Sequence, residues 1–281
     1  MWMNQKTLKI LVRGAGDIAS GIIWNLAYAG FKVVCIDIEK PSCIRTEVAY
    51  SSAIYDGVKE LNGITCVYAK NESEVDGILN EGKVALLVDE VAKILDKIKF
   101  DVVVDAILAK KNLGTNINMA ELVIGVGPGF SAKVDCHYAI ETMRGHLLGK
   151  IYETGSPLAN TGIPGLIASH GKDRVMHSPA EGIFHNKHKI GDTVKKDEVL
   201  AEIEECENGK PTGKVVTLNA SIDGLLRGIL RDGYYATKGL KASDIDPRLT
   251  EYDNCFTISD KARSIGGAVL AIVLHHFSKD K

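Results

Sequence analysis

The sequence lacks several features that would place it in a specialised class of protein. Its longest apolar runs, 102–108 and 268–274, are far shorter than the ~20 residues that cross a bilayer, and the N-terminus has no secretory pattern. The six cysteines form no C-x-x-C pair, so neither a disulfide framework nor a thiolate zinc site is indicated. A net charge of only −2 gives no reason to expect nucleic acid or an anionic membrane as partner. We therefore expect a cytoplasmic protein of two domains, with a full core from its 45% hydrophobic residues.

Segment 8–37 places a glycine-rich bend between a hydrophobic strand and a helix. The bend has the pattern G-x-G-x-x-A, in which glycines permit a tight turn and a close phosphate, and the alanine permits helix–strand packing. An acid ends the following strand, at the spacing of a carboxylate that meets a ribose hydroxyl. We therefore predict NAD(P) or another nucleotide as ligand; the alternative is an ordinary turn that binds nothing. The residues predicted to hold the nucleotide are Gly14, Gly16, Asp17, Ala19 and Asp37.

Up to about residue 150, short β-branched runs alternate with amphipathic stretches. The predicted strands are 10–12, 33–36, 64–68, 84–88, 102–107 and 122–126. The predicted covering helices are 18–29, 72–79 and 91–98. This pattern favours a Rossmann-like, doubly wound parallel sheet over residues 1–150. Because ligands of such sheets bind outside the carboxyl ends of the strands, the residues just after each strand are the candidates for function.

Three of these strand ends carry polar or flexible residues. Arg45 follows one of them and is interpreted either as a contact for an anionic group or as a solvated loop arginine. Asp105 ends another strand, and the pair Lys110 and Lys111 follows it, as an anion contact or as plain surface. The loop 125–130, G-V-G-P-G-F, is rigid and can turn its amides toward a ligand. The loop residues added to the predicted nucleotide site are Gly127 and Gly129.

The segment 135–146 contains the densest set of reactive side chains. We interpret it as a helix opening near Cys136, with Glu141 on a shared face and Arg144 one turn further. The helix N-terminus and the adjacent His137 would then lower the thiol pKa. The alternative is a small buried cysteine beside a surface histidine. The predicted catalytic residues are Cys136, His137 and Arg144.

Beyond residue 150 the sequence contains a repeat, since 179–196 is echoed by 220–239. Each copy predicts two short strands around glycine turns, and the pair resembles the halves of a barrel-sandwich hybrid, as in biotinyl and lipoyl domains. The segment 204–214, at the tip between the halves, has no Met-Lys-Met and places its lysines among polar residues. We therefore expect an all-β domain over 151–247 that carries no covalent biotin or lipoate.

The C-terminal segment 248–281 predicts a helix that starts after Ser259, a good N-cap, and packs back on the sheet domain because it is too apolar to lie free. Three aspartates before or at this helix have the chemistry to ligate a hard cation, but acidic turns usually serve as caps. We therefore predict no metal site. The three aspartates are Asp244, Asp246 and Asp260.

Several motifs together resemble the selenium-dependent molybdenum hydroxylase system proteins of the YqeB type. The motifs are V-R-G-A-G-D-I-A-S-G at 12–21, V-G-P-G-F at 126–130, V-D-C-H and R-G-H within 134–146, N-T-G-I-P-G at 160–165, D-I-D-P-R at 244–248 and I-S-D-K-A-R-S-I-G-G at 258–267. They extend over nearly the whole chain; Lys241-Ala-Ser replaces the Lys-Ile-Gly of many relatives, a mild change in a turn. The resemblance implies an accessory protein in the maturation of molybdenum hydroxylases that carry labile selenium, with the hydroxylase as partner.

Combining both lines, we expect nucleotide binding at the first bend and selenium or sulfur handling at Cys136. One alternative is an NAD(P)-dependent oxidoreductase whose second domain closes over a small metabolite. Another is a non-catalytic scaffold that docks on the hydroxylase through its second domain. The sequence gives no oligomeric state and does not distinguish a catalyst from a chaperone.

Overall fold

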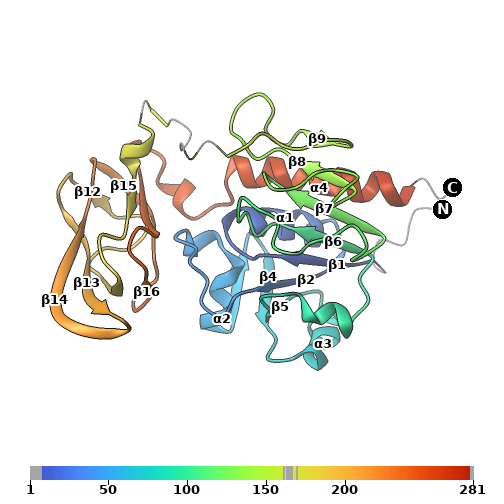
Figure 1. Cartoon of the computed structure of the whole chain (residues 1–281), viewed down its shortest axis with the longest axis horizontal. Coiled ribbons are helices and arrows are strands. Elements are labelled where there is room, and N and C mark those ends of the chain that lie inside the picture. The colour runs from blue at the N-terminus through green and yellow to red at the C-terminus, as the bar shows by residue number, and fades with distance from the viewer. Residues whose placement is uncertain (1–7, 161, 163–166, 169, 279–281) are drawn as a thin grey trace. The chain divides into compact units, whose positions relative to one another are not determined.

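The computed structural model describes residues 8–160, 162, 167–168 and 170–278. The chain forms two compact units (Figure 1). Unit 1 comprises 1–41, 49–161 and 258–281, and unit 2 comprises 42–48 and 162–257. The chain therefore enters unit 2 twice, first with the short segment 42–48 and then with 162–257, and it returns to unit 1 at its C-terminus.

A nine-stranded sheet forms the centre of unit 1, in the order β3-β4-β5-β2-β1-β6-β7-β8-β9. Its strands are β1 Lys9–Arg13, β2 Lys32–Asp37, β3 Val58–Leu61, β4 Ile64–Tyr68, β5 Val84–Val88, β6 Val102–Asp105, β7 Leu122–Val126, β8 Tyr138–Ile140 and β9 Ile151–Tyr152. From β4 to β8 the neighbours pair in parallel. The central strands β1, β6 and β7 are almost entirely buried, because both faces of the sheet are covered.

Both edges of this sheet are antiparallel. Strand β3 pairs antiparallel with β4 across a two-residue turn, Asn62-Gly63, whose φ angles of 48° and 81° suit a tight hairpin. At the opposite edge β9 pairs antiparallel with β8. The sheet is therefore mixed, and the predicted parallel sheet is wrong at both edges. The Asn-Gly pair is the hairpin signal that the sequence interpretation missed.

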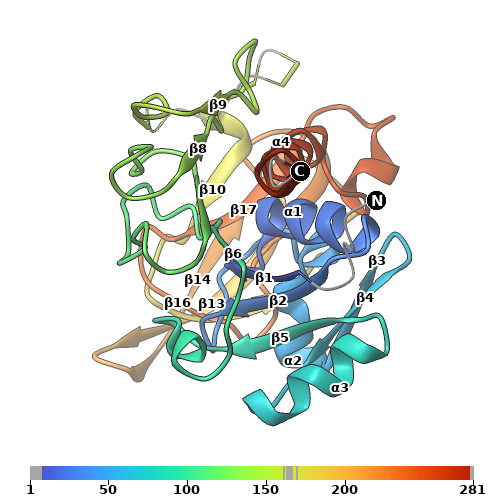
Figure 2. The same cartoon turned by 90° about the vertical axis from the view of Figure 1, so that its right-hand side faces the viewer.

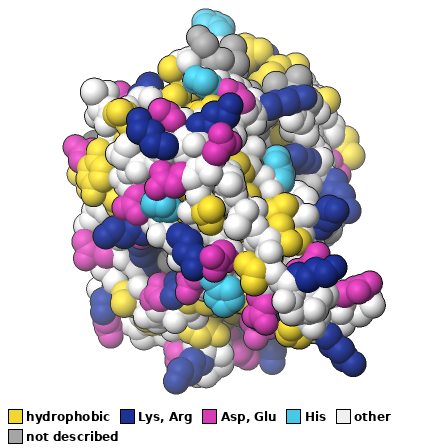
Figure 3. All heavy atoms as spheres, turned by 90° about the vertical axis from the view of Figure 1, so that its left-hand side faces the viewer, with side chains coloured by type: hydrophobic (Ala, Val, Ile, Leu, Met, Phe, Trp, Pro, Cys, Tyr) yellow, Lys and Arg dark blue, Asp and Glu magenta, His cyan; other side chains and the backbone are white. Residues whose placement is uncertain are grey.

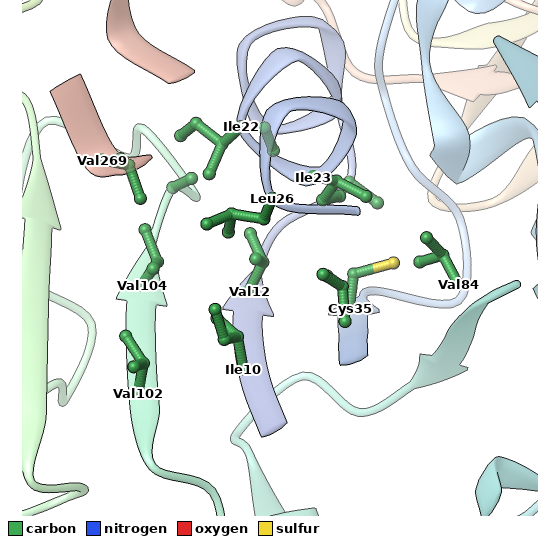
Figure 4. Packing of buried hydrophobic residues seen from close by; sticks show 14 of the residues in the cluster. Ile10, Val12, Ile22, Ile23, Leu26, Cys35, Val84, Val102, Val104 and Val269 are labelled. Carbon is green, nitrogen blue, oxygen red and sulfur yellow. The ribbon is translucent and has the colours of Figure 1, made fainter. Parts of the chain in front are cut away.

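Two helices, α1 Asp17–Tyr28 and α4 Asp260–Ser278, lie side by side on one face of the sheet (Figure 2). Figure 4 shows Ile22, Ile23 and Leu26 of α1 above Ile10 and Val12, with Val269 of α4 beside them, and all are buried. The absence of a side chain at Gly21 lets the two helices approach closely. A Cβ at this position would lie only 2.6 Å from the Ala262 Cβ. The C-terminal helix thus belongs to unit 1, and the Ser259 hydroxyl accepts a hydrogen bond from the Ala262 N–H at 3.2 Å, as an N-cap does.

The opposite face of the sheet packs against α3 Val75–Asn80 and a turn at Lys93–Asp96. The latter is one 3₁₀ turn, entered through Ala92 with a positive φ of 62°, instead of the helix predicted over 91–98. The Asp89 carboxylate fixes this turn by accepting the N–H groups of Lys93 and Ile94 at 3.0 and 2.8 Å. The remaining short helix of unit 1 is α2 Ala53–Asp56.

Unit 2 contains two four-stranded antiparallel sheets, in the orders β10-β17-β15-β12 and β14-β13-β11-β16. Both sheets contribute to one core, with Phe184 and Ile203 from one and Leu226 and Ile245 from the other. Each copy of the sequence repeat supplies one strand to each sheet: β11 and β12 from the first, β15 and β16 from the second. The strands are β10 Val175–His177, β11 Gly182–Asn186, β12 Thr193–Val194, β13 Val199–Glu207, β14 Lys210–Asn219, β15 Gly224–Ile229, β16 Tyr235–Ala236 and β17 Lys241–Asp246.

The predicted fold class was a Rossmann-like parallel sheet domain with an all-β barrel-sandwich hybrid (biotinyl/lipoyl-like) domain, and it is wrong. Unit 1 has a mixed sheet with antiparallel edges, and unit 2 has two separate antiparallel sheets over a shared core. The difference comes from two turns. Asn62-Gly63 forms an antiparallel hairpin, and 131–137 forms an irregular turn, whereas hydrophobic periodicity alone predicted continuous parallel βα units.

Candidate functional site

Three neighbouring parallel strands end together at one edge of the sheet in unit 1. In register, Arg13 of β1 lies beside Asp105 of β6, and Asp105 lies beside Gly125 of β7. The connections that follow these strands, 14–16, 106–115 and 126–130, therefore start from the same edge. This edge carries the residues that the sequence singled out, and we call it the carboxyl edge.

A buried polar network lies at the carboxyl edge. Arg13, Asp105 and Thr115 are each at least 97% buried. The Thr115 hydroxyl donates to Asp105 Oδ2 at 2.6 Å and accepts from Arg13 Nη1, which also lies 3.3 Å from Asp105 Oδ2. Arg13 Nη2 donates to the Leu113 carbonyl at 3.2 Å, and the Ile107 N–H donates to Asp105 Oδ1 at 3.1 Å. Arg13 Nε is buried and has no partner among the described residues.

The bend after β1 is tightly held by its neighbours. Gly14 has φ +97°, and a Cβ there would lie 2.9 Å from the Ala106 carbonyl oxygen, so only glycine fits. The Ala15 carbonyl accepts hydrogen bonds from the Ser20 hydroxyl at 3.1 Å and from the Ser51 N–H at 2.8 Å. The bend therefore has a fixed shape before any ligand arrives.

Asp37 holds the same bend from the end of β2. Its Oδ2 accepts the Ala15 N–H and its Oδ1 accepts the Ile38 N–H, both at 2.8 Å. Burial raises the pKa of this carboxyl, although the two hydrogen bonds act in the opposite direction. Helix α1 then begins after Gly16, which offers no side-chain cap, with Asp17 in its first turn. Of the predicted nucleotide residues, Gly14 and Gly16 lie in the bend, Asp17 and Ala19 lie in the first turn of α1, and Asp37 at the end of β2 already has a structural role.

The glycine loop after β7 approaches the connection after β6. Gly129 has φ +105°, and a Cβ there would lie 2.7 Å from Lys111 Cα, so the two backbones are nearly in contact. The facing connection is itself unusual, because Leu108 and Lys110 have positive φ angles of 60° and 63°. Non-glycine residues in this conformation cluster at functional sites. Gly127, φ +90°, completes the loop and donates its N–H to the Ile140 carbonyl at 2.9 Å.

The predicted helix over 135–146 is absent, and the expectation that its N-terminus lowers the Cys136 pKa is wrong. Asp135 accepts the Ser131 N–H at 2.9 Å and Lys133 has φ +71°, so the chain turns back and enters β8. Cys136 is fully buried, and burial raises the pKa of its thiol to about 11. The thiol is therefore protonated at neutral pH.

The three predicted catalytic residues have different partners. His137 Nδ1 accepts the Val123 N–H at 2.9 Å, and burial lowers the pKa of the ring. Arg144 binds the Asp260 carboxylate through two hydrogen bonds of 2.7 and 3.0 Å. The Cys136 thiol lies 3.9 Å from the Ser131 carbonyl and packs in the hydrophobic core on one face of the sheet. These contacts do not assemble a nucleophile with a base, and the catalytic role of the three stays a prediction.

Other strand-end residues also have structural partners. Arg45, 3% exposed, donates to the Asn254 carbonyl at 2.8 Å in unit 2. Glu141 is completely buried just after β8, a position that the helical interpretation had misplaced. Thr115 and Arg13 were missed by sequence reasoning. The signal that could have found Arg13 is a pair of opposite charges, Arg13 and Asp105, at the carboxyl ends of two buried strands. Among the described residues, no three His, Cys, Asp or Glu side chains are placed to hold a metal ion.

Unit 2 contains a solvent-open hollow of about 560 Å³. Residues of the β11–β12 and β15–β16 connections line it, with acids and bases mixed, and none of the predicted site residues is among them. Across the face of the molecule in Figure 3, cationic and anionic side chains are likewise interspersed. In the part of the chain that the structure describes, no helix is long and apolar enough to cross a membrane.

Comparison with known proteins identifies a relative over most of the chain. The sequence is 43% identical over 265 residues to a protein of Escherichia coli (strain K12) named "Uncharacterized protein YqeB". The match covers 94% of this chain and 47% of that protein, so the chain spans about half the length of this relative. The chain is thus a homologue of that part of YqeB, in agreement with the YqeB-type resemblance, whereas the role in hydroxylase maturation is not part of this finding. No family model matches the sequence.

Solved structures give only distant likenesses. An aspartoacylase family protein from Mesorhizobium loti MAFF303099 has 12% identity and a TM-score of 0.28, with 86% of each chain covered. A succinylglutamate desuccinylase/aspartoacylase from Rhodobacter sphaeroides has 14% identity and the same TM-score, with 85% of each chain covered. A likeness at this score assigns neither the fold nor the function of this chain.

Proposed function

We propose that the carboxyl edge of unit 1 binds a small phosphorylated ligand, a nucleotide, and that the chain is an accessory protein in molybdenum hydroxylase maturation. The binding proposal rests on one observation. The glycine-containing bends and the N-terminus of α1 lie together at the carboxyl ends of neighbouring strands, one of which ends at Arg13. Gly16 leaves this helix N-terminus without a side-chain cap. The pathway proposal rests on the YqeB-type motifs and on homology with YqeB.

The chemistry of the edge suits phosphate oxygens. The first N–H groups of a helix have no partner within the helix and carry partial positive charge, which favours an anion. Successive N–H groups in left-handed or glycine turns form similar concavities, and 108–110 and 127–129 provide such backbone. Arg13 lies buried behind these bends, where it is paired with Asp105, so the backbone N–H groups are the donors that this edge offers to a ligand.

Asp37 is compatible with a ribose contact despite its structural hydrogen bonds. A carboxylate accepts about four hydrogen bonds, and the two oxygens of Asp37 each use one. Asp17 opposes an anion, because its carboxylate lies in the first turn of α1. Cys136 receives no chemical role in this proposal, since its thiol is protonated at neutral pH.

The binding proposal is tested by ligand-induced thermal shifts with NAD, NADP, ATP and CTP. At a ligand concentration of about 100 times Kd, binding adds about 2.7 kcal/mol of stability, a clear rise in Tm. Gly16→Ala should remove most of this shift without unfolding the protein, because φ −72° and ψ −170° are accessible to alanine. Gly77→Ala on exposed α3, where nothing lies within 4 Å of the new methyl, is the matched control. If no nucleotide raises Tm, or if Gly16→Ala responds as wild type does, the binding site is not here.

The pathway proposal needs a separate experiment. Deleting the gene in its host should lower the specific activity and selenium content of molybdenum hydroxylases, and the wild-type gene should restore both. Normal selenium content in the deletion strain would contradict the maturation role while leaving the nucleotide site intact.

A further inference from the structure

The side chain of His137 joins the start of β8 to the neighbouring strand β7 in unit 1. Val123 of β7 donates its N–H to His137 Nδ1 at 2.9 Å, and the Val123 carbonyl accepts the His137 N–H at 2.8 Å. Val123 is completely buried, so its N–H has to find an acceptor inside the protein. One residue thus satisfies both backbone groups of Val123, and we call these two contacts the His137 clip.

The clip requires one protonation state of the imidazole. A backbone N–H is always a donor, so Nδ1 must offer its lone pair to Val123. The ring is therefore neutral and carries its proton on Nε2. When the ring takes up a second proton, Nδ1 becomes a donor as well and faces the donor of Val123. Protonation thus opens the clip because of the direction of this hydrogen bond.

The charged groups around the ring favour the neutral state. His276 of α4 faces His137 with the ring centroids 6.4 Å apart, and Lys133 belongs to the turn that precedes β8. The nearby acids have other partners, since Glu121 lies 3.6 Å from His276 Nε2 and Asp135 accepts a backbone N–H of its own turn. Burial lowers the pKa of the His137 ring, and the charges of His276 and Lys133 lower it further.

The segment that the clip holds is short and lies near the edge of the sheet. Strand β8 has three residues, and its outer neighbour β9 has only two. The turn 131–137 before β8 is irregular, so few other backbone hydrogen bonds join it to β7. Such segments open locally at a lower free energy than the whole domain. His137 is only partly buried, so a proton from the solvent can reach the ring.

We propose that His137 is an acid-sensitive switch in unit 1: the neutral ring fixes the turn 131–137 and the start of β8 to β7, and the protonated ring releases them. The folded-state pKa lies below the ordinary value of 6.5. The clip therefore stabilises the segment fully above pH 6.5, and this contribution is lost as the pH falls through the folded-state pKa. The switch goes beyond nucleotide binding and does not depend on it.

Amide hydrogen exchange of the full chain, followed by NMR from pH 7 to about pH 4 and corrected for intrinsic rates, tests the switch. We expect the protection of the Val123 amide to fall about tenfold or more in acid, while Leu11 in β1 keeps its protection. In His137→Asn, the amide oxygen takes the place of Nδ1 and does not titrate, so protection should be the same throughout. Constant protection of Val123 in the wild type, or an Asn variant that follows the wild type, would overturn the proposal.

A second variant removes the clip at every pH. His137→Ala offers no acceptor, so the Val123 amide should exchange as fast at pH 7 as it does in the wild type in acid. An alanine variant with wild-type protection at pH 7 would show that the clip does not hold this segment. His185→Asn, which replaces an exposed histidine of unit 2, is the matched control and should keep the wild-type response.

The titration of the ring itself links the loss of protection to His137. Imidazole ¹⁵N shifts should show an unprotonated Nδ1 at pH 7, and the midpoint of the ring titration should coincide with the midpoint of the loss of protection at Val123. Lys133→Gln removes a neighbouring cation and should move both midpoints to higher pH together. A proton on Nδ1 at pH 7, or midpoints that do not coincide in both proteins, would contradict the switch.

Discussion

The two units bury carboxylates in opposite ways. In unit 1, the fully buried Glu141 accepts N–H groups from Thr142, Met143 and Leu158, each at 2.8 Å, so both oxygens are occupied. In unit 2, the equally inaccessible Asp244 has one oxygen without a donor and three cations no closer than 3.7 Å. A buried polar group that lacks a partner costs free energy, and a folded protein keeps such a group only where something else compensates.

This difference separates an acid whose hydrogen bonds are complete from an acid whose hydrogen bonds are not. Glu141 needs nothing more, since backbone donors from two segments of the chain already stabilise its charge. Asp105 in the carboxyl edge resembles Glu141, because Thr115, Arg13 and the Ile107 N–H all contact its oxygens. Charge and burial are therefore poor guides to function by themselves, and the number of satisfied hydrogen bonds is the better criterion.

The largest expected effect comes from removing Glu141. Glu141→Ala leaves three buried N–H groups without an acceptor, and we expect a loss of about 3–5 kcal/mol in the free energy of unfolding of unit 1. Urea unfolding followed by circular dichroism measures it. Glu141→Gln, which keeps one acceptor oxygen, should lose clearly less. A Glu141→Ala protein within about 1 kcal/mol of wild type would show that the donors find water instead, and the comparison between the two acids would not hold.

An intermediate effect is expected at Thr115, which links Arg13 to Asp105. Thr115→Val keeps the shape but removes the hydroxyl that donates to Asp105 at 2.6 Å, and we expect a loss of about 1–3 kcal/mol. Thr115→Ser keeps the hydroxyl and is the control. Thermal denaturation of the three proteins side by side gives the ranking. A Val variant as stable as wild type, beside a destabilised Ser variant, would mean that the methyl group, and not the hydrogen bond, stabilises this edge.

Much of the central sheet could be predicted from the sequence, because each strand is a short run of buried β-branched residues. The observed β2, β5 and β7 agree with the predicted runs to within a residue, and α1 agrees equally well. The bend at Gly14 was also found, since a positive φ beside a neighbouring carbonyl admits only glycine. These features depend on local patterns that a single sequence displays.

Features that depend on side chains closing a turn were not predictable in the same way. Asp135 caps Ser131 and turns the segment 131–137 away from the helix that its reactive residues suggested. The Leu158 N–H that occupies the second oxygen of Glu141 is 17 residues away, and Arg174 is 70 residues from Asp244, so the opposite states of the two acids were not visible in the sequence. In this fold, His137 and Arg144 each bind a different structural partner, the Val123 N–H and Asp260.

The smallest effect is expected from replacing Arg248, the partner of Asp246 in unit 2. Burial alone would raise the pKa of this carboxyl, but the hydrogen bonds and charge of Arg248 lower it below its usual value of 3.8. A lowered pKa in the folded state contributes stability that is present above pH 3.8 and is lost as the pH falls through the folded-state pKa. Because Arg248 is 42% exposed, we expect Arg248→Gln to cost no more than about 1 kcal/mol near neutral pH.

The pH dependence of stability tests whether the pair of Asp246 and Arg248 acts through its charges. The difference in stability between wild type and Arg248→Gln should be constant at neutral pH and should vanish in acid, where Asp246 is protonated in both proteins. Tm measured from pH 7 to about pH 2 tests this, with Lys214→Gln on the exposed β14 strand as control. A difference that persists after Asp246 is protonated would mean that Arg248 stabilises unit 2 through packing. The closed pair would then not be the electrostatic counterpart of the open cluster at Asp244.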